Sequence, residues 1–280
     1  MRRIKVILCC CGSLGLVGLK ALLKVSVVEV IAVMTDCHSL EILNLAKTRG
    51  IKIIKGNPRI GRIPSLPIFD LLLSVNYVFI LPKRILDRAR LAAFNIHGSL
   101  LPKYMGRTPV TWTIINDEVE TGITVHEMVP DVDCGPIIYQ EKIEITNDDT
   151  GGTLLSKISA RYPFILNNVI QKLLKNNISR TPQNLNKRTF FGKRESVDGL
   201  IDWRWSARKV YNWVRAQTKP YPGAFGYVNG KKYRFWWVEE VSSMFAPKKR
   251  VGSFFKVKGA LCIACGQGAV RVVRYDAEDR

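Results

Sequence analysis

Short apolar runs alternate with helical stretches through the first hundred residues of this 280-residue chain. Residues 4–10, 27–34, 51–54 and 70–80 each form an apolar run that is typical of a buried strand. Helical patterns follow at residues 16–23, 39–49 and 82–92, with residues 12–15 read as a tight turn. Strands that alternate with helices over short connections predict a doubly wound, mostly parallel α/β sheet.

The pattern changes after residue 189. Short strand-like runs at residues 224–227, 233–238, 252–257, 261–264 and 271–275 are separated by Gly, Pro and Lys turns, and residues 207–216 form a helical pattern. Many short strands at close spacing predict a small β-barrel-like subdomain. We therefore expect a Rossmann-like domain in residues 1–187 and a β-rich C-terminal subdomain in residues 188–280.

Charge and cysteine content limit the partners and the compartment. The chain has 43 basic and 23 acidic residues, and its formal charge of +20 favours acidic partners such as nucleotides, nucleic acid or an anionic membrane surface. The seven cysteines are an odd number without a disulfide-like framework, which indicates a reducing, cytoplasmic compartment. The sequence has no run of about eighteen apolar residues, so we expect no membrane span. Cys262 and Cys265 lack a second ligand pair, so we expect no metal.

The segment FNIHGSLLPKYMGRTP, residues 94–109, carries the candidate chemistry. Asn95 and His97 stand two residues apart in an extended run at residues 93–96, so their side chains point the same way. Asp133 lies in a loop between strand-like runs at residues 122–129 and 137–145. An amide, an imidazole and a carboxylate on loops that flank buried strands form an acid–base and polarising set.

The pattern N-x-H-x-S-L-L-P, followed by D-x-G, resembles the 10-formyltetrahydrofolate-dependent formyltransferases. The surrounding sequence is similar to the nucleotide-sugar N-formyltransferases in particular, and the resemblance covers most of the chain. It implies transfer of a formyl group from 10-formyltetrahydrofolate to the amino group of a dTDP- or UDP-linked amino sugar, as in lipopolysaccharide O-antigen biosynthesis. It also implies an oligonucleotide-binding-like fold for the C-terminal subdomain and a catalytic role for the first domain.

The resemblance assigns roles to the three candidate residues. His97 is expected to act as the base that takes the proton of the attacking amine. The amide of Asn95 is expected to donate a hydrogen bond to the formyl oxygen and the developing oxyanion. Asp133 is expected to hold the tautomer of His97, to raise its basicity and to help relay the proton. His38 and His126 lack a partner set in the sequence, and we read both as structural.

The resemblance also assigns residues to the two ligands. Those expected to contact the folate lie in two loops: Tyr77, Ile80, Leu81, Pro82, Val132 and Gly135. Those expected to contact the nucleotide sugar lie in the loop after His97: Ser99, Lys103, Tyr104 and Arg107. Arg107 is the best diphosphate candidate because a guanidinium binds phosphate through two hydrogen bonds. Met105 stands where the sugar enzymes usually carry Arg, which removes one phosphate contact.

Three alternatives stay open. The first is a methionyl-tRNA formyltransferase, favoured by the 20 basic and 8 acidic residues after position 180 but disfavoured by the lack of a basic, Gly-rich insertion after the second strand. The second is a non-catalytic folate- or nucleotide-binding module. A Rossmann dehydrogenase is weaker, because Gly12, Gly15 and Gly18 are spaced G-x-x-G-x-x-G and not G-x-G-x-x-G. A homodimer is compatible with the sequence.

Overall fold

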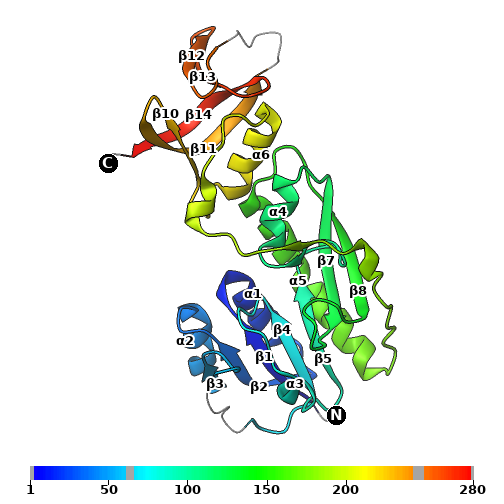
Figure 1. Ribbon diagram of the computed structural model, residues 1–280. Helices are drawn as coiled ribbons and strands as arrows, with labels where there is room; N and C mark the ends of the chain where they lie inside the picture. The colour runs from blue at the N-terminus through cyan, green and yellow to red at the C-terminus, as the bar shows by residue number, and fades with distance from the viewer. Residues whose placement is uncertain (1–2, 61–65, 242–248, 279–280) are drawn as a thin grey trace. The chain divides into compact units, whose positions relative to one another are not determined.

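The computed structural model describes residues 3–60, 66–241 and 249–278. The chain forms two compact units (Figure 1). The first unit holds residues 1–106, 122–143 and 157–190, and the second holds residues 107–121, 144–156 and 191–280. Two internal segments therefore join the second unit, which a linear division of the sequence does not anticipate. The division into a catalytic and a C-terminal domain at residues 187 and 188 stays a prediction.

A seven-stranded sheet forms the centre of the first unit, with the order β3-β2-β1-β4-β5-β7-β8. Its strands are β1 (Ile4–Cys10), β2 (Val28–Thr35), β3 (Lys52–Lys55), β4 (Leu71–Val75), β5 (Ala92–His97), β7 (Glu120–Glu127) and β8 (Ile137–Glu144). Strands β1 to β5 are parallel, and β7 runs antiparallel to β5. The predicted Rossmann-like, mostly parallel sheet is confirmed. The apolar runs explain it, because β1 and β4 are buried along almost their whole length.

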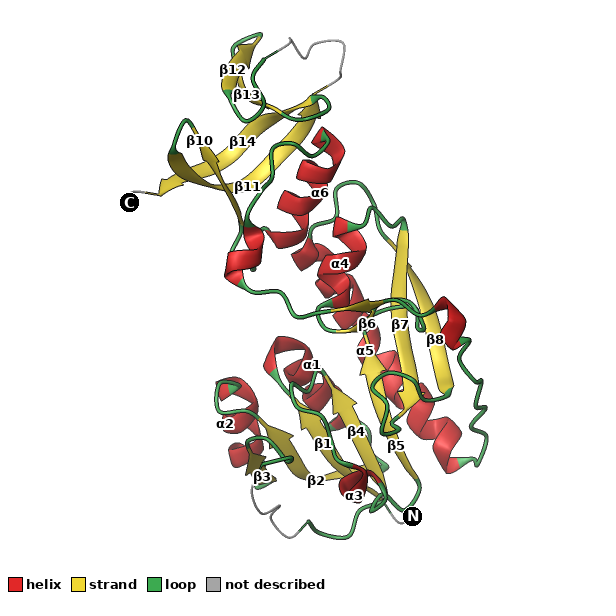
Figure 2. Ribbon diagram, in the orientation of Figure 1, coloured by secondary structure: helices red, strands yellow, loops and turns green. Residues whose placement is uncertain are grey.

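Helices α1 (Gly12–Leu22), α2 (Leu40–Thr48), α3 (Lys83–Leu86) and α5 (Gly151–Leu174) accompany these strands. Figure 2 shows α1 and α2 beside the strands of the first unit. The predicted turn at residues 12–15 is wrong, because α1 already begins at Gly12. A Cβ at Gly15 or Gly18 would lie only 3.0 or 3.1 Å from Cys10 or Val75. These glycines therefore serve close helix–strand packing.

Two predicted elements are shorter in the structure. Strand β4 ends at Val75, where residues 70–80 were expected to be extended, because Asn76 adopts a positive φ of 53°. Helix α3 has only four residues and begins directly after Pro82, where a helix over residues 82–92 was expected. Residues 76–82 consequently form a loop at the carboxyl end of β4. In parallel α/β sheets, ligands bind beyond this end of the strands.

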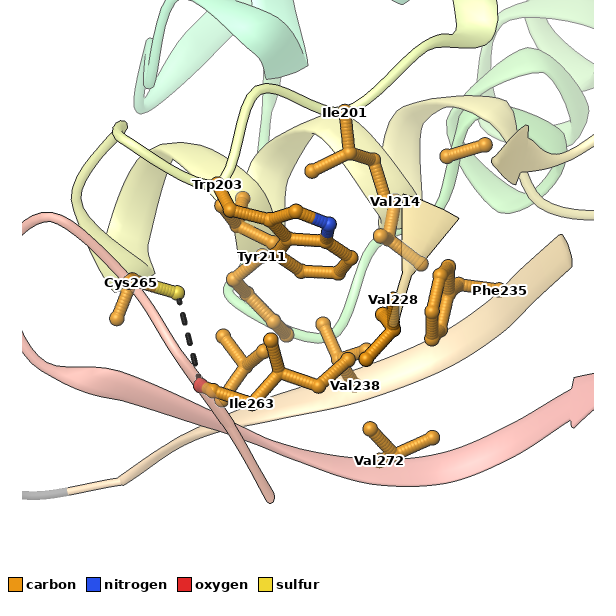
Figure 3. Close-up of a cluster of buried hydrophobic side chains, with 14 residues drawn as sticks. Ile201, Trp203, Tyr211, Val214, Val228, Phe235, Val238, Ile263, Cys265 and Val272 are labelled. Carbon is orange, nitrogen blue, oxygen red and sulfur yellow. Dashed lines mark hydrogen bonds between the residues drawn. The ribbon is translucent and has the colours of Figure 1, made fainter. Parts of the chain in front are cut away.

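The second unit contains a five-stranded antiparallel sheet with the order β10-β11-β14-β13-β12. Its strands are β10 (Ala224–Val228), β11 (Lys231–Val241), β12 (Phe254–Val257), β13 (Ala260–Ala264) and β14 (Ala269–Glu278), and its helices are α4 (Pro109–Ile115) and α6 (Ala207–Gln217). The predicted β-rich subdomain is confirmed. Helix α6 packs on β11, and its buried Val210 and Val214 join a core around Trp203 and Phe235 (Figure 3).

Strand β6 (Met105–Gly106) pairs with β9 (Phe190–Phe191), and the 3-10 helices η1 (Leu185–Lys187) and η2 (Ser196–Gly199) lie on either side of β9 in the sequence. Within the described parts of the chain, no helix has the length and apolar character that crossing a membrane requires.

Candidate active site

The site is built where β5 and β7 pair. Asn95 and His97 lie at the carboxyl end of β5, and the antiparallel register places Asn95 opposite His126 and His97 opposite Thr124. Asp133 follows in the loop between β7 and β8, where it adopts a positive φ of 58°. The alternation of side chains along β5 directs Asn95 and His97 to the same face of the sheet. The structure thus brings Asn95, His97 and Asp133 together.

The Asp133 carboxylate lies at the centre of this group and is almost fully buried. Its Oδ2 atom is 3.6 Å from His97 Nδ1 and accepts a hydrogen bond of 2.9 Å from the Gly106 N–H. Its Oδ1 atom lies 3.4 Å from His126 Nε2 and 3.4 Å from Asn95 Nδ2. Two imidazoles, an amide and a backbone N–H therefore surround a single carboxylate.

The surroundings of Asp133 keep it ionised. Burial by itself raises the pKa of this carboxyl group, but the neighbouring imidazoles of His97 and His126 and the hydrogen bond from the Gly106 N–H together lower the pKa to about 2. The carboxylate is consequently negative throughout the physiological range. A buried negative charge at this place stabilises any positive charge that forms on the adjacent imidazoles.

The Tyr104 carbonyl determines the tautomer of His97. His97 Nε2 lies 2.7 Å from this oxygen, and because a carbonyl can only accept, Nε2 must carry the hydrogen. The lone pair of the neutral ring then lies on Nδ1, which faces Asp133. We expected Asp133 to hold the tautomer, but the carbonyl on the opposite side of the ring does so. Asp133 is instead placed to stabilise the ring after Nδ1 takes a proton.

His126, which we read as structural from the sequence, lies among these candidate residues. Its Nδ1 donates to the Glu127 carbonyl at 2.8 Å, so in the neutral ring Nε2 is an acceptor, 3.1 Å from the Asn95 amide nitrogen. His126 therefore orients the Asn95 side chain as well as facing Asp133. The sequence held a signal for this role, because antiparallel pairing of the runs before and after the central loop sets His126 opposite Asn95.

The loop after β5 is shaped by its own buried side chains. The hydroxyl of Ser99 donates to the Lys103 carbonyl at 2.7 Å, and Ser99 is fully buried. Tyr104 is also buried, and its N–H donates to Thr189 Oγ1 at 2.8 Å. Ser99 and Tyr104 thus shape the loop, whereas Lys103 and Arg107 are exposed. Of the predicted nucleotide-sugar residues, only these last two have an exposed, charged side chain.

The residues assigned to the folate differ in exposure. Ile80 is 47% and Val132 is 44% exposed, so both present apolar surface, while Tyr77 and Pro82 are half-buried. Leu81 is buried in the core of the first unit. There is no room for a side chain at Gly135, because a Cβ there would lie 1.9 Å from the Glu127 carbonyl oxygen. Exposed apolar side chains in the two loops suit a flat aromatic ring.

No group of three or more His, Cys, Asp and Glu side chains in the described part of the chain is arranged to hold a metal ion.

Comparison with known protein families gives two matches. The family model described as formyl transferase matches residues 68–170, and the model described as formyl transferase, C-terminal domain, matches residues 194–280. The first match contains Asn95, His97 and Asp133, and the second spans the five-stranded sheet.

Solved structures show the same fold over the whole chain. An N-formyltransferase from Helicobacter canadensis, in complex with folinic acid and dTDP-3-aminofucose, is 20% identical with a TM-score of 0.71, covering 99% of this chain and 100% of that one. WlaRD, a sugar 3N-formyl transferase in the presence of dTDP and 5-N-formyl-THF, is 20% identical with a TM-score of 0.74, covering 100% of both chains. The methionyl-tRNA formyltransferase from Clostridium thermocellum is 16% identical with a TM-score of 0.56, covering 96% and 99%.

Proposed function

Since this chain belongs to the formyl transferase family, we propose that it transfers a formyl group from 10-formyltetrahydrofolate to the amino group of a nucleotide-linked amino sugar. The observation that carries the proposal is the buried Asp133 carboxylate, with His97, His126 and Asn95 around it. The relatives that hold dTDP-3-aminofucose or dTDP, each with a formylated folate, support a dTDP-linked sugar as the acceptor.

His97 is the base in this proposal. The amine that attacks the formyl carbon must lose a proton, and Nδ1 of His97 is the ring nitrogen free to take it, because Nε2 donates to the Tyr104 carbonyl. The imidazolium that results faces Asp133 at 3.6 Å, and the buried carboxylate stabilises it. The proton can then pass to the departing nitrogen of the folate as the bond to the formyl carbon breaks.

Asn95 stabilises the negative charge that develops on the formyl oxygen. Its amide nitrogen carries two hydrogens, one directed to His126 at 3.1 Å and one to Asp133 at 3.4 Å. The longer contact is the weaker, so the hydrogen on the Asp133 side is the one that can turn to the substrate. His126 keeps the amide oriented while this happens.

The co-substrate 10-formyltetrahydrofolate supplies the formyl group and leaves as tetrahydrofolate. Ile80 and Val132 would hold its ring through apolar contact, and the backbone around Asp133 would bind its polar edge. Lys103 and Arg107 supply positive charge for the diphosphate of the nucleotide sugar.

Methionyl-tRNA is the second candidate acceptor. It is favoured by the 20 basic residues after position 180, against 8 acidic ones, since a basic surface attracts a phosphate backbone. Activity on tRNA would fall steeply with added salt, because each phosphate contact releases counterions. Activity on a nucleotide sugar would depend on salt much less.

The test is an assay of tetrahydrofolate release with 10-formyltetrahydrofolate as donor. The acceptors are dTDP- and UDP-linked 3-amino and 4-amino sugars and methionyl-tRNA, each with the unmodified protein and with His97→Ala. Turnover with a sugar nucleotide that His97→Ala abolishes supports the proposal. Turnover only with methionyl-tRNA would show that the acceptor is tRNA and not a nucleotide sugar, while formyl transfer itself would stand. Folate binding without turnover on any acceptor would indicate a non-catalytic binding module.

A further inference from the structure

The segment at residues 180–183, between α5 and η1, is fixed beside the loop that carries Asp133. The Arg180 guanidinium forms an ion pair of 2.6 Å with Glu127, the last residue of β7. Thr181 and Ile137 exchange two backbone hydrogen bonds of 2.8 and 2.9 Å. The segment is therefore held to both strands that flank the Asp133 loop, and Gln183 follows at the end of this anchored stretch.

The Gln183 amide brackets the backbone of Asp133. Its Nε2 donates to the Asp133 carbonyl and to the Gly135 carbonyl, both at 2.7 Å. An amide nitrogen has two hydrogens, so both are used, and they hold two carbonyls that lie two residues apart. Both contacts are short for hydrogen bonds between neutral groups. The loop is thus pinned on either side of Cys134.

Asp133 needs such a restraint because its backbone conformation is unfavourable. Its φ of 58° lies in the left-handed region, which costs a non-glycine residue about 1 kcal/mol or more. In that conformation the two carboxylate oxygens point to different partners, Oδ2 toward His97 and Oδ1 toward His126 and Asn95. A small rotation of the backbone would move both oxygens at once.

The other end of the Gln183 amide indicates that the side chain is held for its donors. Its Oε1 atom is buried and has no hydrogen-bond partner in the described part of the chain. A buried acceptor without a partner has an energetic cost. Both hydrogens of the same amide nevertheless bond to the Asp133 loop, so the orientation of the amide follows from its two donor contacts.

We propose that Gln183 is a positioning residue for formyl transfer, whose amide holds Asp133 in the conformation in which its carboxylate serves His97 and Asn95. The inference rests on the proposed function for its catalytic consequence, and on the hydrogen bonds of the loop for its geometry. No other neutral side chain of similar size can replace it. Methionine has a similar length but no donor, and asparagine is one methylene shorter.

The test compares Gln183→Met, which keeps the length and removes both donors, with the unmodified protein. The first measurement is the titration of the Asp133 carboxyl by NMR without ligands. If the loop is released, the carboxylate loses part of its contact with His97, His126 and Gly106, and its pKa rises from about 2 toward the usual value. The second measurement is steady-state kinetics, where we expect kcat to fall about tenfold or more with KM for the sugar nucleotide almost unchanged.

Gln217→Met is the matched control. Gln217 is a buried amide of the second unit that donates to the Trp213 carbonyl at 2.8 Å and accepts from Arg194 at 2.9 Å. Its loss should lower the melting temperature to a similar extent, with kcat and the Asp133 titration unchanged. Gln183→Leu, which is also apolar and lacks both donors, replaces Gln183→Met if that variant does not fold, and it should also lower kcat.

A merely structural role for Gln183 would lower the melting temperature alone. An unchanged Asp133 titration together with an unchanged kcat in the Gln183 variant would overturn the proposal. The titration does not require turnover. If the unmodified protein formylates no amino sugar, the proposed function fails, while a raised Asp133 pKa in Gln183→Met still establishes the positioning contact.

Discussion

Replacing Asp133 by Asn removes the charge that faces the base and keeps the size of the side chain. His97 Nδ1 lies 3.6 Å from Asp133 Oδ2, and at an effective dielectric constant of about 20 a pair of unit charges at that separation attracts by roughly 4–5 kcal/mol. If this attraction exists only after His97 takes the proton, its loss raises the barrier by about the same amount. We therefore expect Asp133→Asn to lower kcat by about 10³-fold, with KM for the sugar nucleotide changed little.

The assay is the initial rate of tetrahydrofolate release at saturating donor and acceptor, with the folded fraction determined by thermal unfolding. Asp131→Asn is the matched control, because Asp131 is an exposed carboxylate of the same loop. It should leave kcat within about twofold, since exposed charges are screened by water. A kcat for Asp133→Asn within tenfold of the unmodified protein would refute the argument that this carboxylate stabilises the protonated base.

Three further predictions concern stability and sterics. Because the pKa of Asp133 is lowered from 3.8 to about 2, its ionised form contributes about 2 kcal/mol of stability above pH 4, and that contribution is lost as the pH falls through about 2. Urea unfolding at pH 5, 4 and 3 should show about half of this loss by pH 3 in the unmodified protein but not in Asp133→Asn. Arg215→Met should destabilise the second unit by about 3 kcal/mol in urea unfolding, because it removes buried hydrogen bonds to the carbonyls of Thr146 and Asp149. A decrease in the free energy of unfolding of less than about 1 kcal/mol would contradict this prediction. Gly135→Ala should lower kcat more than tenfold, because the new Cβ would lie 1.9 Å from the Glu127 carbonyl oxygen and would force the Asp133 loop to shift. Gly192→Ala is the control and should leave kcat unchanged, because there is open space around Gly192. Equal rates for the two variants would exclude the steric argument.

The sequence predicted the architecture well, because apolar runs with helices between them have few arrangements other than a parallel sheet. It was less accurate at element ends, which depend on single backbone angles. Asn76 ends β4 five residues earlier than its apolar neighbours suggest, because its φ is positive. Residues 107–121 and 144–156 belong to the second unit because of tertiary packing, and a local sequence pattern does not predict such packing.

The candidate site was predictable where it depended on side-chain type and spacing, and not where it depended on register or backbone atoms. Asn95, His97 and Asp133 are recognisable as a motif, but His126 joins them only through strand register. The tautomer of His97 follows from the Tyr104 carbonyl, and Asp133 is held by the amide of Gln183, fifty residues further along the chain. Backbone oxygens and contacts between distant segments leave no signature in residue identity.

The most direct test of the account is mass spectrometry of a dTDP-linked amino sugar after incubation with the protein and 10-formyltetrahydrofolate labelled in the formyl carbon. The account predicts a product that has gained one labelled formyl group on its amino nitrogen, formed by the unmodified protein and almost absent with Asp133→Asn. An unchanged sugar nucleotide, with the label recovered on methionyl-tRNA under the same conditions, would contradict it.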